Sequence, residues 1–335
     1  RIIAVLTVLM LISASTLLTV QAALQEGEGR DLFVAPDGKD THPGTAEQPL
    51  ATLGRASALA TPGSTIRLAA GTYREREVML RVGGSAQKPL VIEGAKNGQT
   101  ILKGSMVVTG WMPHAGTTWK VEGWKVNSQQ LFADGRPQQQ IGVQCSFNTQ
   151  KLWADHVALP PVGKGLEDLK PGSFFYAADS NTLYAQLADG SDPNARVMEA
   201  GVANYVLDTG THAQIVLRNL AIRHSNATAF GTRAGVLRVH GKAVVVEDCE
   251  ISQGDFAGIS MEGESHIVRR CRITENGSVG IDINGSDAAH GFRWRADRPP
   301  QNILMEDLEI TGNNYRLFYN QWHAGGMKCI PSCRA

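Results

Sequence analysis

One lysine interrupts an apolar stretch close to the end of the sequence, in Gly326-Met-Lys-Cys-Ile330. Successive side chains of a β-strand point to opposite faces, so a strand here places Lys328 outward and Met327 and Cys329 inward. A lysine whose pKa is lowered by its surroundings can act as a general base. The chemistry open to it is removal of the proton beside a uronate carboxylate, which begins a β-elimination.

Asp282 is the predicted neighbour of this lysine. It holds the matching outward position in Gly280-Ile-Asp-Ile-Asn284, and stacked strands lie about 4.8 Å apart. A carboxylate so close raises the pKa of a lysine, so without a bound metal the two side chains would form a salt bridge on the strand face. A catalytic role and a structural salt bridge both remain open for Lys328.

An inserted loop, residues 312–323, supplies further candidates. His323 lies three residues before Gly326 and could transfer protons near neutral pH, or it could hydrogen-bond to a turn. Trp322 and Arg316 belong to the same loop. Aromatic and guanidinium groups at the rim of a groove suit a sugar acid, so both are candidate substrate-binding residues.

Three other arginines could bind an acidic sugar. Arg293 and Arg295 flank Trp294 in a second inserted loop and could hold a uronate carboxylate by paired hydrogen bonds, or they could be solvated loop charges. Arg238 falls in the same predicted outward column as Lys328 and could bind another sugar unit.

Glu262 and Asp282 provide a rival chemistry. They are predicted to lie one coil and one outward position apart, with Glu262 also a candidate substrate-binding residue. Two carboxyl groups about 5 to 9 Å apart can hydrolyse a glycosidic bond.

An internal repeat predicts how these residues are positioned. Four segments share the pattern apolar-x-apolar-x-x-(Leu/Cys)-x-Ile, and two of their pivots, Cys249 and Cys271, lie 22 residues apart. A second short strand follows each pivot. The segments are 215–223, 244–252, 266–274 and 303–311, and the second strands are 236–240, 258–262, 280–284 and 326–330.

Repeats of this length, with short strands and glycine-rich turns, are typical of a solenoid whose stacked coils bury a shared core. The predicted fold is an all-β, right-handed parallel β-helix with a short N-terminal capping helix at 53–59 and a β-rich insertion. The expected organisation is a signal peptide (1–22), the cap and first coils (31–104), the insertion (105–200) and the β-helix repeats (201–335), the last expected to be C-terminally incomplete.

The remaining features indicate export. Ile2 to Leu18 is almost continuously apolar, and Val20-Gln-Ala22 offers a cleavage site, as in a signal peptide that lacks its first residues. We therefore expect a secreted, periplasmic or cell-surface protein with no stable membrane anchor after processing. Its expected partner is a polysaccharide substrate, and its expected oligomeric state is a monomer. The formal net charge of +0 gives no indication of nucleic-acid binding. The five cysteines show no zinc-ligand spacing.

The segment from Phe33 to Tyr73 resembles the opening of exported carbohydrate-active β-helix proteins, and the repeats resemble the pectate-lyase-like superfamily. Gly326-Met-Lys328 and Ser278-Val-Gly-Ile-Asp282 are similar to two strands of family nine polysaccharide lyases. This resemblance implies that Lys328 is the catalytic base and Asp282 a ligand for Ca²⁺, the candidate cofactor. Ser278 and Val279 stand where that family has further aspartates.

The preferred prediction is an exported enzyme that cleaves an acidic polysaccharide by β-elimination. A glycoside hydrolase on the same fold and a non-catalytic glycan-binding surface protein are the alternatives.

Overall fold

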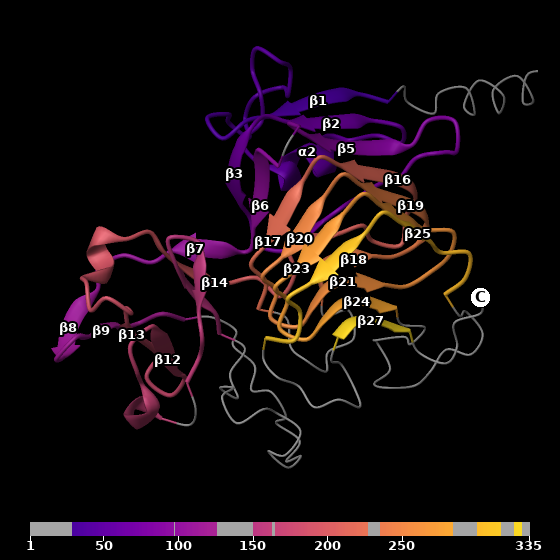
Figure 1. The fold of residues 1–335 in the computed structure, drawn as a ribbon. Coiled ribbons are helices and arrows are strands. Elements are labelled where there is room, and N and C mark those ends of the chain that lie inside the picture. The colour runs from indigo at the N-terminus through magenta and orange to yellow at the C-terminus, as the bar shows by residue number, and fades with distance from the viewer. Residues whose placement is uncertain are drawn as a thin grey trace, which may run out of the picture.

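The computed structural model describes residues 29–96, 98–125, 150–162, 165–226, 235–283, 300–315 and 325–329. Most strands belong to three parallel sheets, here called sheets A, B and C, which the chain visits in turn as it coils (Figure 1). The predicted right-handed parallel β-helix is confirmed. Residues 1–28, which include the predicted signal peptide, lie outside the described part.

Sheet A contains β1 (Asp31–Val34), β2 (Thr65–Leu68), β5 (Leu90–Gly94), β16 (Ala213–Arg218), β19 (Lys242–Glu247), β22 (Ile267–Arg269) and β25 (Leu304–Glu306). Sheet B contains β3 (Gly71–Arg74), β6 (Thr100–Lys103), β17 (Ala221–Arg223), β20 (Glu250–Ser252), β23 (Arg272–Thr274) and β26 (Glu309–Thr311). Sheet C contains β4 (Val78–Met79), β15 (Leu207–Asp208), β18 (Gly235–Val239), β21 (Ala257–Met261), β24 (Val279–Ile283) and β27 (Gly325–Cys329).

Each repeated segment that reads as one strand is in fact two strands joined by a sharp corner. The residue before the pivot adopts a left-handed backbone, with φ of 58° at Asn219 and 52° at Asp248. Asn and Asp tolerate this conformation better than most side chains. The chain therefore turns from sheet A to sheet B at this point, and the pivot side chain enters the core.

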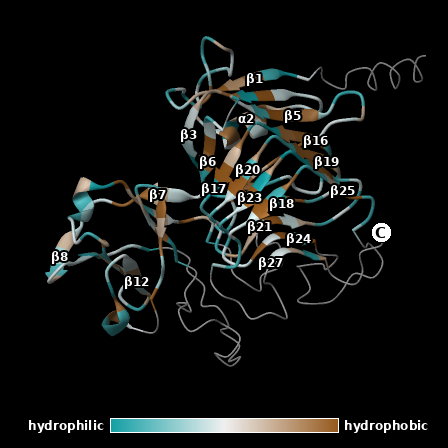
Figure 2. Cartoon of the chain, in the orientation of Figure 1, coloured by the Kyte–Doolittle hydropathy of each residue, from teal (hydrophilic) through white to brown (hydrophobic). Residues whose placement is uncertain are grey.

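Apolar side chains fill the interior of the coils, and hydrophobic residues are frequent along the solenoid strands (Figure 2). Ile259, Met261 and Ile281 are fully buried, as expected for inward positions. Cys249 and Cys271 are free thiols within this core. Met327 pairs with Ile281 but is 54% exposed, because it belongs to the last described coil.

The capping helix is α2 (Leu53–Leu59), with the predicted bounds. The Thr52 side chain accepts a hydrogen bond from the Arg55 backbone N–H, and the Glu75 carboxylate accepts hydrogen bonds from Leu53 and Gly54. These contacts satisfy backbone groups that the start of a helix leaves unpaired. Leu53 is buried in the solenoid core next to the first strands.

A β-rich insertion leaves the solenoid after β6 and returns before β15, and it projects to the left in Figure 1. It forms two four-stranded antiparallel sheets with their own apolar core. No helix of the described residues is long and apolar enough to cross a membrane. The elements of the insertion are β7 (Ser105–Val107), β8 (Met112–Ala115), β9 (Thr118–Val121), β10 (Leu152–Ala154), β11 (Val157–Leu159), η2 (Leu166–Asp168), β12 (Ser173–Ala177), β13 (Thr182–Gln186), η3 (Pro193–Ala195) and β14 (Met198–Gly201).

Candidate active site

The outer face of sheet C carries one continuous column of polar side chains. The strand register places Lys328 beside Asp282, Asp282 beside Ser260, Ser260 beside Arg238, and Arg238 beside Asp208. We call these five residues the sheet C column. Each parallel strand offers the same outward position, so the column runs along the solenoid axis with about 4.8 Å between neighbours.

Burial shifts the ionisation of the two residues at the end of this column. The pKa of Lys328 is lowered by burial, although the charge of Asp282 works to raise it. Burial raises the pKa of Asp282 to about 6; the charge of Lys328 lowers it and the charge of Glu262 raises it. The sequence suggested that Asp282 would dominate and raise the pKa of Lys328. The net shift is the opposite, because the lysine is half-buried and loses solvation.

Glu262 follows β21 and is near enough for its charge to act on Asp282. The Glu262 side chain is partly exposed, whereas Asp282 is 6% exposed. The two carboxyl groups therefore sit in different environments, a difference that can separate the roles of an acid and a base.

Arg238 lies farther along the column. Its guanidinium stacks over the ring of Tyr205 at 3.9 Å, and its Nη1 is 3.9 Å from Asp208 Oδ2. Asp208 Oδ1 lies 3.0 Å from His240 Nδ1 and accepts a hydrogen bond from the Gly210 N–H. Strand alternation places His240 on the outer face, two residues after Arg238, but sequence reasoning named neither Asp208 nor His240 as a site residue.

Five predicted site residues lie outside the described residues, and the structure does not place them. They belong to the two inserted loops and are Arg293, Arg295, Arg316, Trp322 and His323.

The described residues do not by themselves fit the calcium site that the resemblance implies. Ca²⁺ takes about six to eight oxygen ligands, usually from several carboxylates and carbonyls. No group of three or more His, Cys, Asp or Glu side chains that could hold a metal occurs in the described ranges. Around Asp282, the corresponding family aspartates are replaced by Ser278 and Val279.

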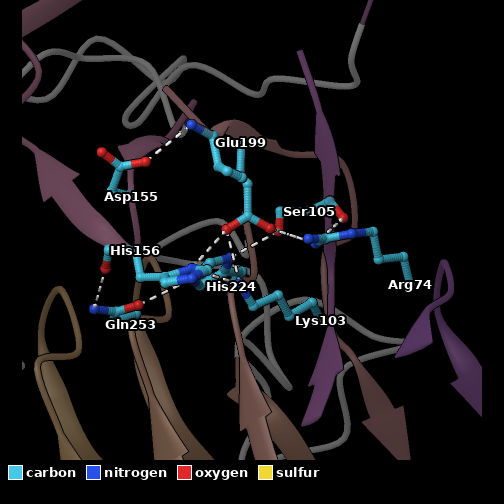
Figure 3. Close-up of polar contacts among 9 residues, drawn as sticks. Arg74, Lys103, Ser105, Asp155, His156, Glu199, His224 and Gln253 are labelled. Carbon is cyan, nitrogen blue, oxygen red and sulfur yellow. Dashed lines mark hydrogen bonds and ion pairs between the residues drawn. The ribbon is translucent and has the colours of Figure 1, made fainter. Parts of the chain in front are cut away.

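A second polar cluster lies where the insertion meets the solenoid (Figure 3). Glu199, on β14, is fully buried and accepts a hydrogen bond from Lys103 Nζ at 2.7 Å. Arg74 forms a further ion pair with Glu199, and His156 Nδ1 lies 3.3 Å from its carboxylate. Burial lowers the pKa of Lys103. Burial works to raise the pKa of Glu199, but the hydrogen bond and charge of Lys103 and the charge of Arg74 leave it lowered.

Ser105, His224 and Gln253 continue this cluster. The His224 ring stacks on Trp153 at 3.7 Å; its Nδ1 lies 2.7 Å from Ser105 Oγ, and its Nε2 lies 2.9 Å from Gln253 Oε1. A serine beside a histidine can act as nucleophile and base. Ser105 and His224 are both 0% exposed, however, so this pair joins the insertion to the solenoid and does not face a substrate.

The geometry of the coils agrees with the solved structure of XylC in complex with xylose. The TM-score is 0.69 at 17% identity, over 89% of this chain and 56% of that one. This similarity shows the parallel β-helix fold. Residues 36–142 of this chain match a family described as a protein of unknown function, DUF1565.

Two curated relatives share shorter regions with this chain. The uncharacterized protein YwoF of Bacillus subtilis is 35% identical over 85 residues, which are 25% of this chain and 18% of that protein. Pectate lyase PEL9 of Emericella nidulans is 36% identical over 75 residues, which are 22% of this chain and 18% of that protein. The chain thus spans less than a fifth of the length of these relatives.

Proposed function

We propose that this chain is an exported carbohydrate-active enzyme that acts as a monomer and cleaves an acidic polysaccharide by β-elimination. The observation that carries the proposal is Lys328, a half-buried lysine with a lowered pKa, at the end of an outward polar column. A base must be unprotonated to remove a proton, and burial moves lysine in that direction. The similarity to a protein named a pectate lyase supports the same class of substrate.

In the proposed reaction, Lys328 Nζ takes the proton from C5 of a uronate. The C5 electrons form a double bond to C4, the bond from C4 to the glycosidic oxygen breaks, and the departing oxygen takes a proton. Negative charge that develops on the uronate carboxylate needs a neighbouring cation. Arg293 and Arg295 are candidates for that cation, and His323 is a candidate for the proton donor.

The test is the ultraviolet absorbance of the unsaturated uronate product, measured on pectate, alginate and glycosaminoglycans with calcium or with a chelator. We expect Lys328→Ala to lower turnover by about 10²-fold or more, as for loss of a general base. Lys242→Ala is the matched control, because Lys242 is a 60% exposed lysine on sheet A that pairs with Glu264. Equal turnover with calcium and with the chelator would show that Asp282 holds no required metal. Unchanged turnover in Lys328→Ala would exclude the proposed base.

Glycoside hydrolysis is the second candidate, and the raised pKa of Asp282 is the observation that favours it. A carboxyl group with a pKa of about 6 is suited to act as a general acid, with Glu262 as the second carboxylate. A hydrolase would release new reducing ends without an unsaturated product. Binding without either product, with affinity lost in Lys328→Ala, would identify a glycan-binding protein.

A further inference from the structure

Four buried polar atoms on the outer side of sheet C have no hydrogen-bond partner within the described residues. Their side chains are 6% exposed or less. Buried polar atoms in native proteins almost always have partners, and an unpaired one costs about 1–3 kcal/mol. A set of them on one face therefore points to a ligand. The atoms are Asp208 Oδ2, His240 Nε2, Ser260 Oγ and Asp282 Oδ1.

Asp208 and His240 are the two residues of this face that contact each other directly. The contact of 3.0 Å between Asp208 Oδ1 and His240 Nδ1 is the hydrogen bond by which a histidine N–H donates to a carboxylate. His240 Nε2 then lies on the same face as the second oxygen of Asp208, and it can accept a hydrogen bond when the ring is neutral or donate one when the ring is protonated. The backbone reinforces the pair, because Thr209 Oγ1 accepts a hydrogen bond from the His240 N–H at 2.8 Å.

The charges at this position disfavour an acidic sugar. Burial works to raise the pKa of Asp208, but the hydrogen bond and charge of His240 outweigh it, and the Gly210 N–H and the charge of Arg238 add to the lowering. Asp208 is thus an anion at neutral pH. Arg238 already pairs with Asp208 and stacks on Tyr205. A uronate here would bring a second carboxylate against Asp208, whereas sugar hydroxyls can donate to Asp208 Oδ2 and can either donate to or accept from His240 Nε2.

We propose that Asp208 and His240 form a subsite for an uncharged, hydroxyl-bearing sugar unit, so that the substrate is an acidic polysaccharide in which uronates are separated by uncharged sugars. This inference rests on the proposed function, which places a uronate at Lys328. Four strand spacings separate Asp208 from Lys328 along the column, about 19 Å. An extended chain therefore contacts both positions through different sugar units.

The experiment measures affinity by calorimetry with the full chain carrying Lys328→Ala, which stops cleavage under the proposed function. The probes are two matched pairs: polygalacturonate against the alternating polymer of galacturonate and rhamnose, and alginate against hyaluronan. We expect at least one alternating polymer to bind about tenfold more tightly than its uniform partner. Asp208→Asn and His240→Gln should each weaken that binding about tenfold. Asp208→Asn should also reduce the affinity ratio of the alternating polymer to the uniform polymer, because it removes the charge that repels a uronate.

Glu309→Gln is the control, because it makes the same charge change at a half-exposed position on sheet B. Thermal melting checks that each variant is folded. Three results would overturn the proposed subsite. The uniform polymers could bind more tightly, neither alternating polymer could bind, or folded Asp208→Asn could keep the affinity of the parent chain. Failure of the lyase proposal would give a different result. Cleavage would persist in Lys328→Ala, while the alternating polymers would still bind more tightly than the uniform ones.

Discussion

At the scale of single residues, Lys328 and Asp282 oppose each other. Burial lowers the pKa of Lys328, and the ionised form of Asp282 raises it. Asp282 itself has a pKa of about 6, so its charge develops in the pH range in which many enzymes work. The pair therefore links the ionisation of the proposed base to a neighbouring carboxyl group.

The first prediction concerns Asp282→Asn. The substitution removes the charge that raises the pKa of Lys328 and leaves the burial that lowers it. Lys328 then loses its proton at a lower pH, so the acid limb of the kcat/KM profile should move to lower pH while substantial activity remains. The measurement is the initial rate of unsaturated product formation as a function of pH.

A glycoside hydrolase gives the contrary result. If Asp282 donates the proton to the leaving sugar, Asp282→Asn should lose about 10²–10⁴-fold in turnover, and no shifted profile would remain. Ser260→Ala is a nearby control, since Ser260 is the neighbour of Asp282 in the column but carries no charge.

Sequence pattern could place some site residues and not others. Strand alternation and the repeat were enough to predict the neighbours Lys328 and Asp282, because both depend on local periodicity. The direction of the net pKa shift of Lys328 could not be predicted, because solvation depends on the whole surroundings of the side chain. The pairing of His240 with Asp208 was also missed, since the carboxylate comes from the preceding coil, 32 residues away in sequence.

At the scale of elements, sheet A carries outward charges of alternating sign on successive strands. Opposite charges side by side on neighbouring strands stabilise a sheet, and like charges destabilise it. The ladder fixes the lateral register of the strands in addition to the apolar core. Its members are Asp31, Arg67, Glu93, Arg218, Glu247, Arg269 and Glu306.

Glu247→Lys should disturb this ladder. Glu247 accepts hydrogen bonds from Arg269 and pairs in register with Arg218 on the other side. A lysine there would place three cations in a row, and we expect a loss of about 1–2 kcal/mol in the free energy of unfolding. Urea unfolding measures this change. Glu247→Gln should cost less, and an equal loss in both variants would show that repulsion is not the cause.

The junction cluster is the second element-scale feature. Glu199→Gln leaves Lys103 as a buried cation, 2% exposed, without its anionic partner. Breaking such a buried pair costs about 3–5 kcal/mol in the free energy of unfolding, measured with denaturant. Asp155→Asn is a matched change in the same insertion, and the loss of its exposed pairing with Arg196 should cost much less than the loss of Glu199, because solvent screens that pair. Equal losses in the free energy of unfolding for Glu199→Gln and Asp155→Asn would mean that the ion pairs of Glu199 do not stabilise the junction.

The elements show where sequence reasoning reaches its limit. The repeat predicted the coils and the capping helix because each coil repeats the same core positions. A turn was expected at the pivot Leu220, but the left-handed backbone of Asn219 was not, since a single left-handed residue inside an apolar pattern leaves the pattern intact. The junction cluster was missed because Lys103 and Glu199 are 96 residues apart and follow no period. The sequence signal for this pair was a positive and a negative residue on either side of the predicted insertion.

At the scale of the whole molecule, two separate apolar cores meet through polar contacts. The solenoid core and the insertion core are distinct clusters, and the junction between them includes Glu199 and His224. The stability of the joined molecule should therefore depend on pH more than either core would alone. Glu199 has a lowered pKa, so its contribution is present above its ordinary pKa of 4.5 and is lost as the pH falls through the folded value.

His224 extends this acid sensitivity toward neutral pH. Burial lowers its pKa well below 6.5 in the folded state, so between those two values the unfolded chain binds a proton that the folded chain does not. Stability is therefore full above pH 6.5 and falls as the pH drops below it. We expect His224→Gln to lower stability at high pH, because the contact with Ser105 changes, and to flatten the slope below neutrality.

The slope is measured by urea unfolding at a series of pH values between about 5 and 8. Some slope should remain in His224→Gln, because burial also lowers the pKa of His266. His42→Gln is the control, since His42 lies in the N-terminal cap region away from the junction and its ring contacts the Pro49 carbonyl. A slope in His224→Gln as steep as in the unmodified chain would show that the junction does not sense acid, and the pH dependence would then belong to the solenoid.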